Sequence, residues 1–447
     1  MSPAPIVVAP SSSPAVVEGL VARTVELDVS PDLVAIGGRP GGVLWQREDQ
    51  GLAGFGAAAR LALPVGLDGA GDVGDVGDVG AGHAPAGGVG AVVDALAAIE
   101  IDDRLGLPGC GPVALGALPF DRGAPSSLVV PRWLVGRRGD TAWLTSIAPA
   151  GANHDDPLGT LRALEAGGPV GEPPDEFTLT SALPHAVWRR LIDDAVRRIR
   201  AGELSKVVLA RKVDVAANRP FVIPDVLERL VALYPACMIF HIGGFIGASP
   251  ELLVERHGST VHSLPLAGTA ARSGDLAADE RLVAALVAST KDRGEHRFVT
   301  DELIRALTPV CRELHLPDVP EVLALRNVSH LATPIVGRLR GQPSPSALDL
   351  VARVHPTPAV AGTPTGAAVA HLQRVEGFDR GAFAGPVGWM DHRGDGAWAL
   401  GIRSARVAGS TASLYAGVGV VADSEPDAEL EETQLKLQAL LAALVRP

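Results

Sequence analysis

The sequence predicts an α+β fold with large, mostly antiparallel β-sheets. Many strand-like runs are joined by tight turns, such as HGST at 257–260 and RGDG at 393–396, which suit antiparallel neighbours. The helical stretches come in groups and do not alternate strictly with single strands. The glycines of GVG at 417–419 do not form a dinucleotide-binding fingerprint, so a Rossmann fold is not predicted.

Composition and charge restrict the classes of function. The chain has 447 residues, of which 47% are hydrophobic and 20% charged, as in an ordinary globular protein. No apolar run reaches membrane-spanning length, and the N-terminus lacks the basic region of a secretory signal. Three widely spaced cysteines indicate reduced thiols, so we expect a cytoplasmic protein with no membrane contact. The net charge of −12 argues against nucleic acid as a partner. An anionic substrate would need local cations.

The first 180 residues predict a strand-rich N-terminal part with one long loop. Residues 66–90 are Gly-rich and repeat the triplet GDV, a composition that cannot bury a side-chain core, so we expect a flexible surface loop there. The runs at 113–120 and 127–147 read as strands joined by turns. A second loop-rich patch follows at 167–179.

Residues 181–447 carry a denser pattern and predict one continuous catalytic part. The segment 185–204 places apolar residues at helical spacing, and Gly202 ends the pattern. The strand-like runs that follow are 206–215, 236–250, 251–269, 385–390, 397–407 and 413–421. The helical stretches between them are 221–234, 279–289, 291–314, 364–374 and 424–445.

Lys206 stands at the start of an apolar run in GELSKVVLAR, residues 202–211. A lysine at the end of a strand most often extends its ammonium to water. A half-buried lysine can instead lose its proton and act as a base. The run alone does not decide between these two interpretations.

Two acidic pairs lie at helical spacing. Asp292 and Glu295 share one helical face, and Glu429 and Glu432 do so in a second helix. Each pair by itself is typical of a solvated acidic face near a helix N-terminus. Two pairs on two helices could also form an oxygen cage for Mg²⁺, which takes a few carboxylates together with water and substrate oxygens.

Seven segments in this order resemble the chorismate-utilising enzymes and, within them, the isochorismate synthases. They are SKVVLAR at 205–211, IGASPELL at 246–253, LPLAGTAAR at 264–272, KDRGEHRFV at 291–299, HPTPAVAGTP at 355–364, GIRSA at 401–405 and YAGVGVVADSEPDAELEETQLK at 415–436. The resemblance covers about residues 185–447. It implies the fold of anthranilate synthase component I, in which two large antiparallel sheets pack face to face with helices outside.

The resemblance also implies a reaction and its residues. Chorismate would be converted to isochorismate, with water added at C2 and the C4 hydroxyl lost. Lys206 would be the general base and Glu251 the general acid. Glu295 and Glu432 would hold Mg²⁺, with Asp292 and Glu429 behind them through water. The substrate would be held by Gly268, Thr269, His330, Ala359, Arg403, Gly417 and Lys436, although a histidine such as His330 is more often structural.

Two positions separate this interpretation from related activities. Family members that add ammonia tend to have glutamine where Lys206 stands, and aminodeoxychorismate synthases have a nucleophilic lysine where this chain has Ala267. We therefore expect no amidotransferase subunit, and a monomer acting on chorismate alone. Three alternatives stay open, namely a salicylate synthase that goes on to eliminate pyruvate, a catalytically silent metabolite-binding paralogue, and an acidic scaffold without a site. The pathway served, menaquinone or siderophore biosynthesis, also stays open.

Overall fold

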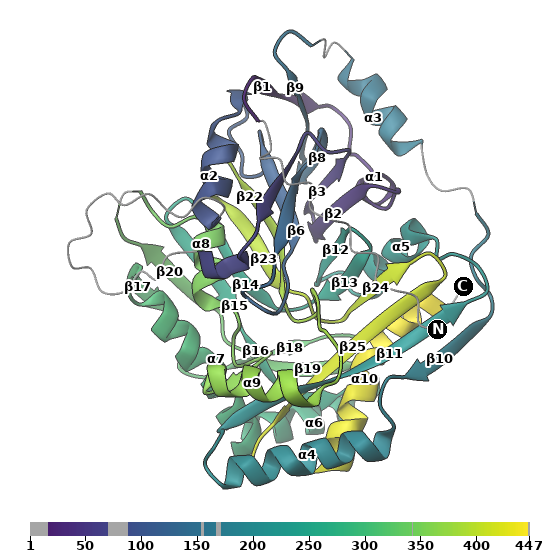
Figure 1. Ribbon diagram of the computed structural model, residues 1–447, viewed down its shortest axis with the longest axis vertical. Helices are drawn as coiled ribbons and strands as arrows, with labels where there is room; N and C mark the ends of the chain where they lie inside the picture. The colour runs from purple at the N-terminus through teal and green to yellow at the C-terminus, as the bar shows by residue number, and fades with distance from the viewer. Residues whose placement is uncertain (1–16, 70–87, 153–155, 167–170, 342, 446–447) are drawn as a thin grey trace.

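The predicted α+β class is confirmed by the computed structural model, which describes residues 17–69, 88–152, 156–166, 171–341 and 343–445 (Figure 1). The strands form one 13-stranded, one 9-stranded and one 3-stranded sheet. Pairing is antiparallel throughout the described sheets except between β1 and β5. The small third sheet was not expected from the sequence.

The 13-stranded sheet combines strands from both ends of the chain. In spatial order it contains β10 (Phe177–Ser181), β11 (Lys206–Ala217), β25 (Thr411–Val420), β24 (Ser404–Ala408), β13 (Phe245–Ser249), β12 (Met238–Ile242), β2 (Gly42–Arg47), β3 (Gln50–Phe55), β8 (Trp133–Arg138), β9 (Thr141–Pro149), β1 (Leu20–Leu27) and β5 (Glu100–Asp102), while β21 (Gly362–Thr363) pairs with β11.

The other two sheets lie beside it. The 9-stranded sheet runs β17 (Cys311–His315), β20 (Ile335–Leu339), β15 (Thr260–Leu264), β14 (Leu252–His257), β23 (Gly396–Leu400), β22 (Pro386–Asp391), β6 (Val113–Ala117), β7 (Ser126–Val130) and β4 (Ala59–Leu63). The 3-stranded sheet is β16 (Leu266–Ala271), β19 (Val328–Ala332) and β18 (Glu321–Ala324). Strands from both sides of residue 180 share both large sheets.

The two large sheets pack face to face through one buried cluster. Trp45 of β2 meets Trp389 of β22 edge to face, with ring centroids 6.3 Å apart, so the sheets touch directly. Phe240 and Phe245 stack in the same cluster. Side chains alternate between the faces of each strand, so Leu252 of β14 enters this core while Leu253 faces outward.

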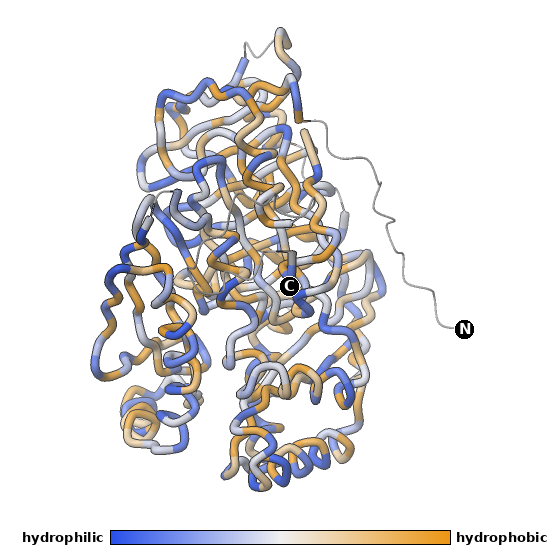
Figure 2. The backbone as a smooth tube through the Cα atoms, turned by 60° about the vertical axis from the view of Figure 1, so that its left-hand side comes forward, coloured by the Kyte–Doolittle hydropathy of each residue, from blue (hydrophilic) through white to orange (hydrophobic). Residues whose placement is uncertain are grey.

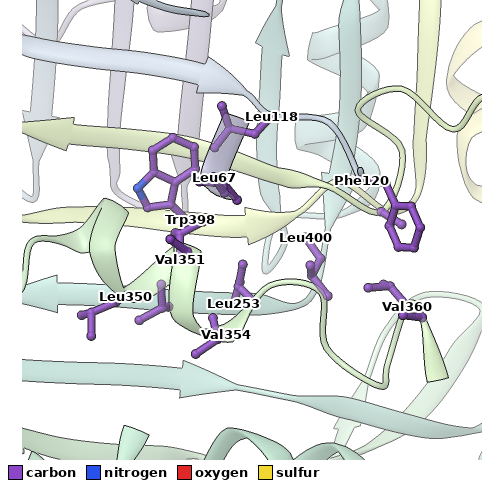
Figure 3. Close-up of a cluster of buried hydrophobic side chains, with 14 of the residues drawn as sticks. Leu67, Leu118, Phe120, Leu253, Leu350, Val351, Val354, Val360, Trp398 and Leu400 are labelled. Carbon is purple, nitrogen blue, oxygen red and sulfur yellow. The ribbon is translucent and has the colours of Figure 1, made fainter. Parts of the chain in front are cut away.

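Helices cover the outer faces of the sheets. They are α1 (Leu33–Gly37), α2 (Val89–Ala97), α3 (Pro157–Glu165), α4 (His185–Arg200), α5 (Ile223–Leu233), α6 (Leu276–Ala288), α7 (Thr290–Leu307), α8 (Ala347–Val354), α9 (Thr365–Val375) and α10 (Pro426–Val445). Helix α8 places Leu350, Val351 and Val354 against the outward face of β14 and β23 (Figure 3). The helical coils at the lower edge of the molecule alternate between hydrophobic and hydrophilic residues, as helices with one buried face do (Figure 2).

Several predicted elements differ in extent. The predicted helix 291–314 ends at Leu307, because Cys311–His315 pairs with β20 as a strand. The predicted strand 397–407 is broken into β23 and β24. Most of the predicted loop 66–90 lies outside the described residues, but Gly66–Gly69 forms a short 3-10 helix and α2 begins at Val89.

The three cysteines are buried and form no disulfide. Among the helices of the described residues, none is long and apolar enough to cross a membrane.

Candidate active site

A cavity with about 720 Å³ of empty space, counted with its opening to solvent, lies where β11, β25, the small third sheet, α7 and α10 meet. Its lining includes most of the residues proposed from the sequence. These are Lys206, Glu251, Gly268, Thr269, Glu295, His330, Ala359, Arg403, Gly417, Glu432 and Lys436. Asp292 and Glu429 are not part of the lining.

Lys206 points into this cavity and not into bulk water. It is the first residue of β11, and its side chain is 1% exposed. Its Nζ lies 3.0 Å from Oε1 of Glu295, which projects from the N-terminal half of α7. Of the two interpretations of Lys206, the lysine that extends to solvent is therefore wrong, and the structure shows the buried one.

Gly419 allows this ion pair to form, and the sequence reasoning missed it. It lies opposite Val208 in the pairing of β25 with β11. A Cβ at this position would lie 2.1 Å from Oε1 of Glu295 and 2.9 Å from Cε of Lys206. The sequence signal for this position was the pair of alternating glycines in GVG, because a glycine within a strand often marks a place where other groups approach the backbone closely. Here the side chains of Glu295 and Lys206 approach the backbone at Gly419.

Glu251 is a buried carboxyl group held in its protonated form. It lies between β13 and β14, is 5% exposed, and its Oε1 accepts a hydrogen bond from the Leu266 N–H at 3.5 Å. Burial raises the pKa of Glu251 to about 8, although the Leu266 N–H and the nearby cations Lys206 and Arg403 act against the rise. At neutral pH it can donate a proton.

Arg403 presents its guanidinium to the cavity from an unusual backbone conformation. Its φ of 51° falls in the break between β23 and β24. Within the described residues no carboxylate lies within salt-bridge distance of it, and its one side-chain hydrogen-bond partner is Nε2 of His330, 3.1 Å from Nη2. The remaining donors can bind an anionic group of a ligand.

His330 orients Arg403 as a neutral ring. Burial, with the charges of Arg403 and Lys436, lowers the pKa of His330 to about 3. Nδ1 lies 3.0 Å from the Gly268 carbonyl, so Nδ1–H donates to it and Nε2 is left to accept from Arg403. His330 therefore holds Arg403 in place, a role that its residue type alone did not reveal.

Helix α10 supplies another part of the cavity wall through Glu432 and Lys436. Oε1 of Glu432 lies 2.5 Å from Nζ of Lys436 and accepts a hydrogen bond from the Thr269 hydroxyl at 3.2 Å. Lys436 also donates to the Gly417 carbonyl at 3.0 Å, so α10 is tied to β25 and to β16. These contacts bring Thr269, Gly417, Glu432 and Lys436 together as the sequence interpretation required.

The remaining two acidic residues of the predicted metal site, Glu429 and Asp292, do not line the cavity. Glu429 is buried and pairs with Lys291, with Nζ 3.1 Å from its Oε1. Asp292 lies behind Gly268, where a Cβ would come 3.0 Å from the Asp292 Cβ. That these two carboxylates support a metal through water stays a prediction.

The residues fit the donor type that Mg²⁺ prefers. Glu295 and Glu432 contribute carboxylate oxygens to one cavity, and Mg²⁺ usually takes one or two carboxylates while water and ligand oxygens complete its shell. Across the described ranges, no three His, Cys, Asp or Glu side chains form a metal-binding group. A metal ion held by Glu295 and Glu432 would therefore need oxygens of water or of a ligand to complete its coordination.

Comparison with known proteins places this cavity in a family. Residues 91–445 match the family described as chorismate binding enzyme. The chain belongs to this family. The match covers most of the described strands and helices and every residue of the cavity.

Individual relatives agree with this assignment. The chain is 37% identical over 349 residues to the isochorismate synthase DhbC of Bacillus subtilis, covering 74% of this chain and 81% of the relative. It is 35% identical over 337 residues to the isochorismate synthase EntC of Escherichia coli, covering 74% and 80%. The structure of MenF, the menaquinone-specific isochorismate synthase of Escherichia coli, superposes with a TM-score of 0.76 at 24% identity, covering 98% and 97%.

Other residues that line this cavity were not found from the sequence. Tyr415 of β25 and Phe383 line it and stack on each other, with ring centroids 5.0 Å apart. Arg380 also lines it and is 5% exposed. Its segment, EGFDR at 376–380, carries no recognisable spacing motif, so only the tertiary structure places it here.

Replacing Gly419 with alanine should remove the Lys206–Glu295 ion pair. The added Cβ would occupy the position of the Glu295 carboxylate, so we expect a loss of activity of about 100-fold or more, as a misplacement near 1 Å causes. Turnover measured beside Gly294→Ala tests this, since a Cβ at Gly294 meets nothing within 4 Å. Equal activity of the two variants would contradict the role given to Gly419.

Proposed function

We propose that the protein converts chorismate to isochorismate, with water added at C2 and the hydroxyl lost from C4. The observation that carries the proposal is that a lysine and a protonated glutamate, Lys206 and Glu251, line one cavity beside the uncompensated cation Arg403. The relatives named isochorismate synthase support the same reaction. It needs no second subunit, because all three groups come from one chain.

The two catalytic groups match the two difficulties of this exchange. Water is a poor nucleophile, and Lys206 would take its proton as it attacks C2. Hydroxide is a poor leaving group, and Glu251 would donate a proton to it as the C4–O bond breaks. Burial suits both residues to the task, because it keeps Glu251 protonated and keeps the Lys206 amine inside the cavity.

The charged groups around them suit a dianionic substrate. Arg403, oriented by His330, would bind one substrate carboxylate in bidentate geometry. Lys436 and the backbone of Gly268 and Ala359 would hold the remaining polar groups. A Mg²⁺ ion on Glu295 and Glu432 would neutralise the ring carboxylate and draw electrons from the diene.

Incubation with chorismate, followed by chromatographic identification of the product, tests the proposed reaction. We expect isochorismate and no aminated product in excess ammonia, because Ala267 offers no nucleophile and Lys206 favours water. Salicylate as the main product would show that pyruvate is eliminated afterwards. Anthranilate, aminodeoxychorismate or no product at all would contradict the proposal.

Removing the Lys206 amine should abolish most of the turnover without unfolding the protein. A general base supplies about 10²- to 10⁴-fold, so Lys206→Ala should lower kcat by at least that range. The matched control is Lys212→Ala, which removes a partly exposed lysine from the same strand. A kcat for Lys206→Ala near the wild-type value would end the assignment of the base.

The activity should fall above about pH 8, where Glu251 loses its proton. Because the raised pKa of Glu251 keeps it protonated below that value, kcat/KM should decrease as the pH rises through it. Below that pH, Glu251→Gln should lose about 10²-fold or more relative to the wild type, whereas Glu255→Gln on β14 should keep the wild-type profile. A kcat/KM that stays constant far above pH 8 would contradict the role of Glu251 as acid.

Turnover should also require Mg²⁺. Glu295→Gln and Glu432→Gln should abolish it with an unchanged circular dichroism spectrum, since each removes a charged oxygen ligand. Glu431→Gln changes an exposed neighbour of Glu432 on α10 and should remain active. Mg²⁺ binding, followed by calorimetry with and without chorismate, should be weak until the substrate adds its oxygens. Full activity after EDTA treatment would overturn the metal assignment.

A further inference from the structure

The strand that begins with Lys206 has an interrupted edge. On one side β11 pairs with β25 from Val207 to Ala216. On the other side β21 pairs with Lys206 and Val207, and β10 pairs only from Val213 onward. Within the described chain, no strand covers residues 208–212 on this side, although backbone groups in a buried strand need hydrogen-bond partners.

Two side chains close this interruption. The Val208 N–H is bonded to a backbone group, the Ala361 carbonyl, at 2.8 Å. The Val208 carbonyl is bonded to a side chain, because Nη2 of Arg380 donates to it at 2.7 Å. Oε1 of Glu376 accepts from the Ala210 N–H at 2.8 Å. The Lys212 carbonyl, next in the row, accepts from Ala182 N at 3.0 Å, where the chain leaves β10. Glu376 and Arg380 therefore occupy the place of a missing strand.

The same two residues form a rigid unit. Both are about 5% exposed or less, and Arg380 grips Glu376 with two hydrogen bonds, Nε to Oε2 at 2.8 Å and Nη2 to Oε1 at 2.5 Å. The guanidinium also lies over the ring of Phe120, 4.3 Å from its centroid. A planar guanidinium that is held by Glu376 and by the ring of Phe120 has little freedom to move.

Arg380 links the strand to a second part of the cavity wall. Its Nη1 donates to the Val360 carbonyl at 2.8 Å, in the turn that carries Ala359. Lys206 and Val208 are two residues apart, so both side chains lie on the face of β11 that lines the cavity. A shift at Val208 would therefore move the Lys206 amine relative to Ala359.

We propose that Glu376 and Arg380 are positioning residues, which replace a missing strand at the edge of β11 and thereby set the place of Lys206 in the cavity. This inference rests on the proposed function, because it assigns the pair to the geometry of the base. A buried ion pair is by itself weak evidence for stability, since desolvation opposes the attraction. The hydrogen bonds that this pair directs to Val208 and Ala210 distinguish it from a pair that only joins two side chains.

The test replaces both partners at once. A single replacement would leave a buried charge uncompensated and could prevent folding, whereas an apolar pair of similar size often folds normally. The variant is therefore Glu376→Leu with Arg380→Met. The control is Asp395→Leu with Arg256→Met, a largely buried pair 3.7 Å apart that also binds backbone groups, Gly258 N and Arg393 O, but does not line the cavity.

Three readouts separate positioning from mere stability. We expect kcat on chorismate to fall about 10- to 100-fold in the first double variant, with KM changed less than about threefold, and to stay unchanged in the control. Amide hydrogen exchange should accelerate at Ala210, whose N–H bonds to Oε1 of Glu376, in the first variant only. In a Lys206→Ala background the same double replacement should cause no further loss of kcat, because the residue it positions is gone.

Several outcomes would overturn the inference. They are a wild-type kcat in the first variant, an equal loss in the control, an undiminished loss in the Lys206→Ala background, or unchanged exchange at the Ala210 amide. A wild-type protein that produces no isochorismate would instead refute the proposed function. The exchange measurement does not depend on turnover and would still decide whether the pair holds the strand.

Discussion

The pairing of β11 with β25 is the constraint on which the site depends. Its register places Val208 opposite Gly419 and Ala210 opposite Gly417, so the glycines of one strand lie beside the Lys206 end of the other. Only a residue without a Cβ leaves room there for the Glu295 carboxylate. A slip of one residue would turn Lys206 to the opposite face of the sheet and separate it from Glu295.

Burial gives the ionisable groups of the cavity different protonation states. Glu251 is held as a neutral acid, and His330 as a neutral ring that accepts from Arg403. The carboxylates of Glu295 and Glu432 each face a lysine across the cavity wall. Glu251 can therefore act as an acid at neutral pH in the same small volume as two carboxylates that are paired with lysines.

The chain concentrates cations in one place although its overall charge is −12. Lys206, Arg403 and Lys436 all line the cavity, and Arg403 has no carboxylate partner within the described residues. Lys206 and Lys436 are already paired with Glu295 and Glu432, so it is the Arg403 charge that would give an anionic substrate a locally favourable field. Each of these cations is supplied by a different element, β11, the break before β24 and α10, so the field exists only in the folded chain.

The amino-acid sequence by itself determined the α+β class and most helices and strands, because periodicity is a local property of the chain. Its ordered motifs, through their resemblance to the chorismate-utilising enzymes, also named many residues that line the cavity, but not Arg380, Phe383 or Tyr415. Lys206 and Glu251 could be named for this reason, and so could the acidic pairs on α7 and α10. The tertiary structure alone decided that Lys206 pairs with Glu295, that Gly419 makes room for them, and that Glu376 and Arg380 complete the edge of β11. Glu376 lies 166 residues from Ala210, whose amide it accepts, and no local pattern encodes a contact of that span. The predicted helix 291–314 overran for the same reason, since its last residues join a strand that is distant in sequence.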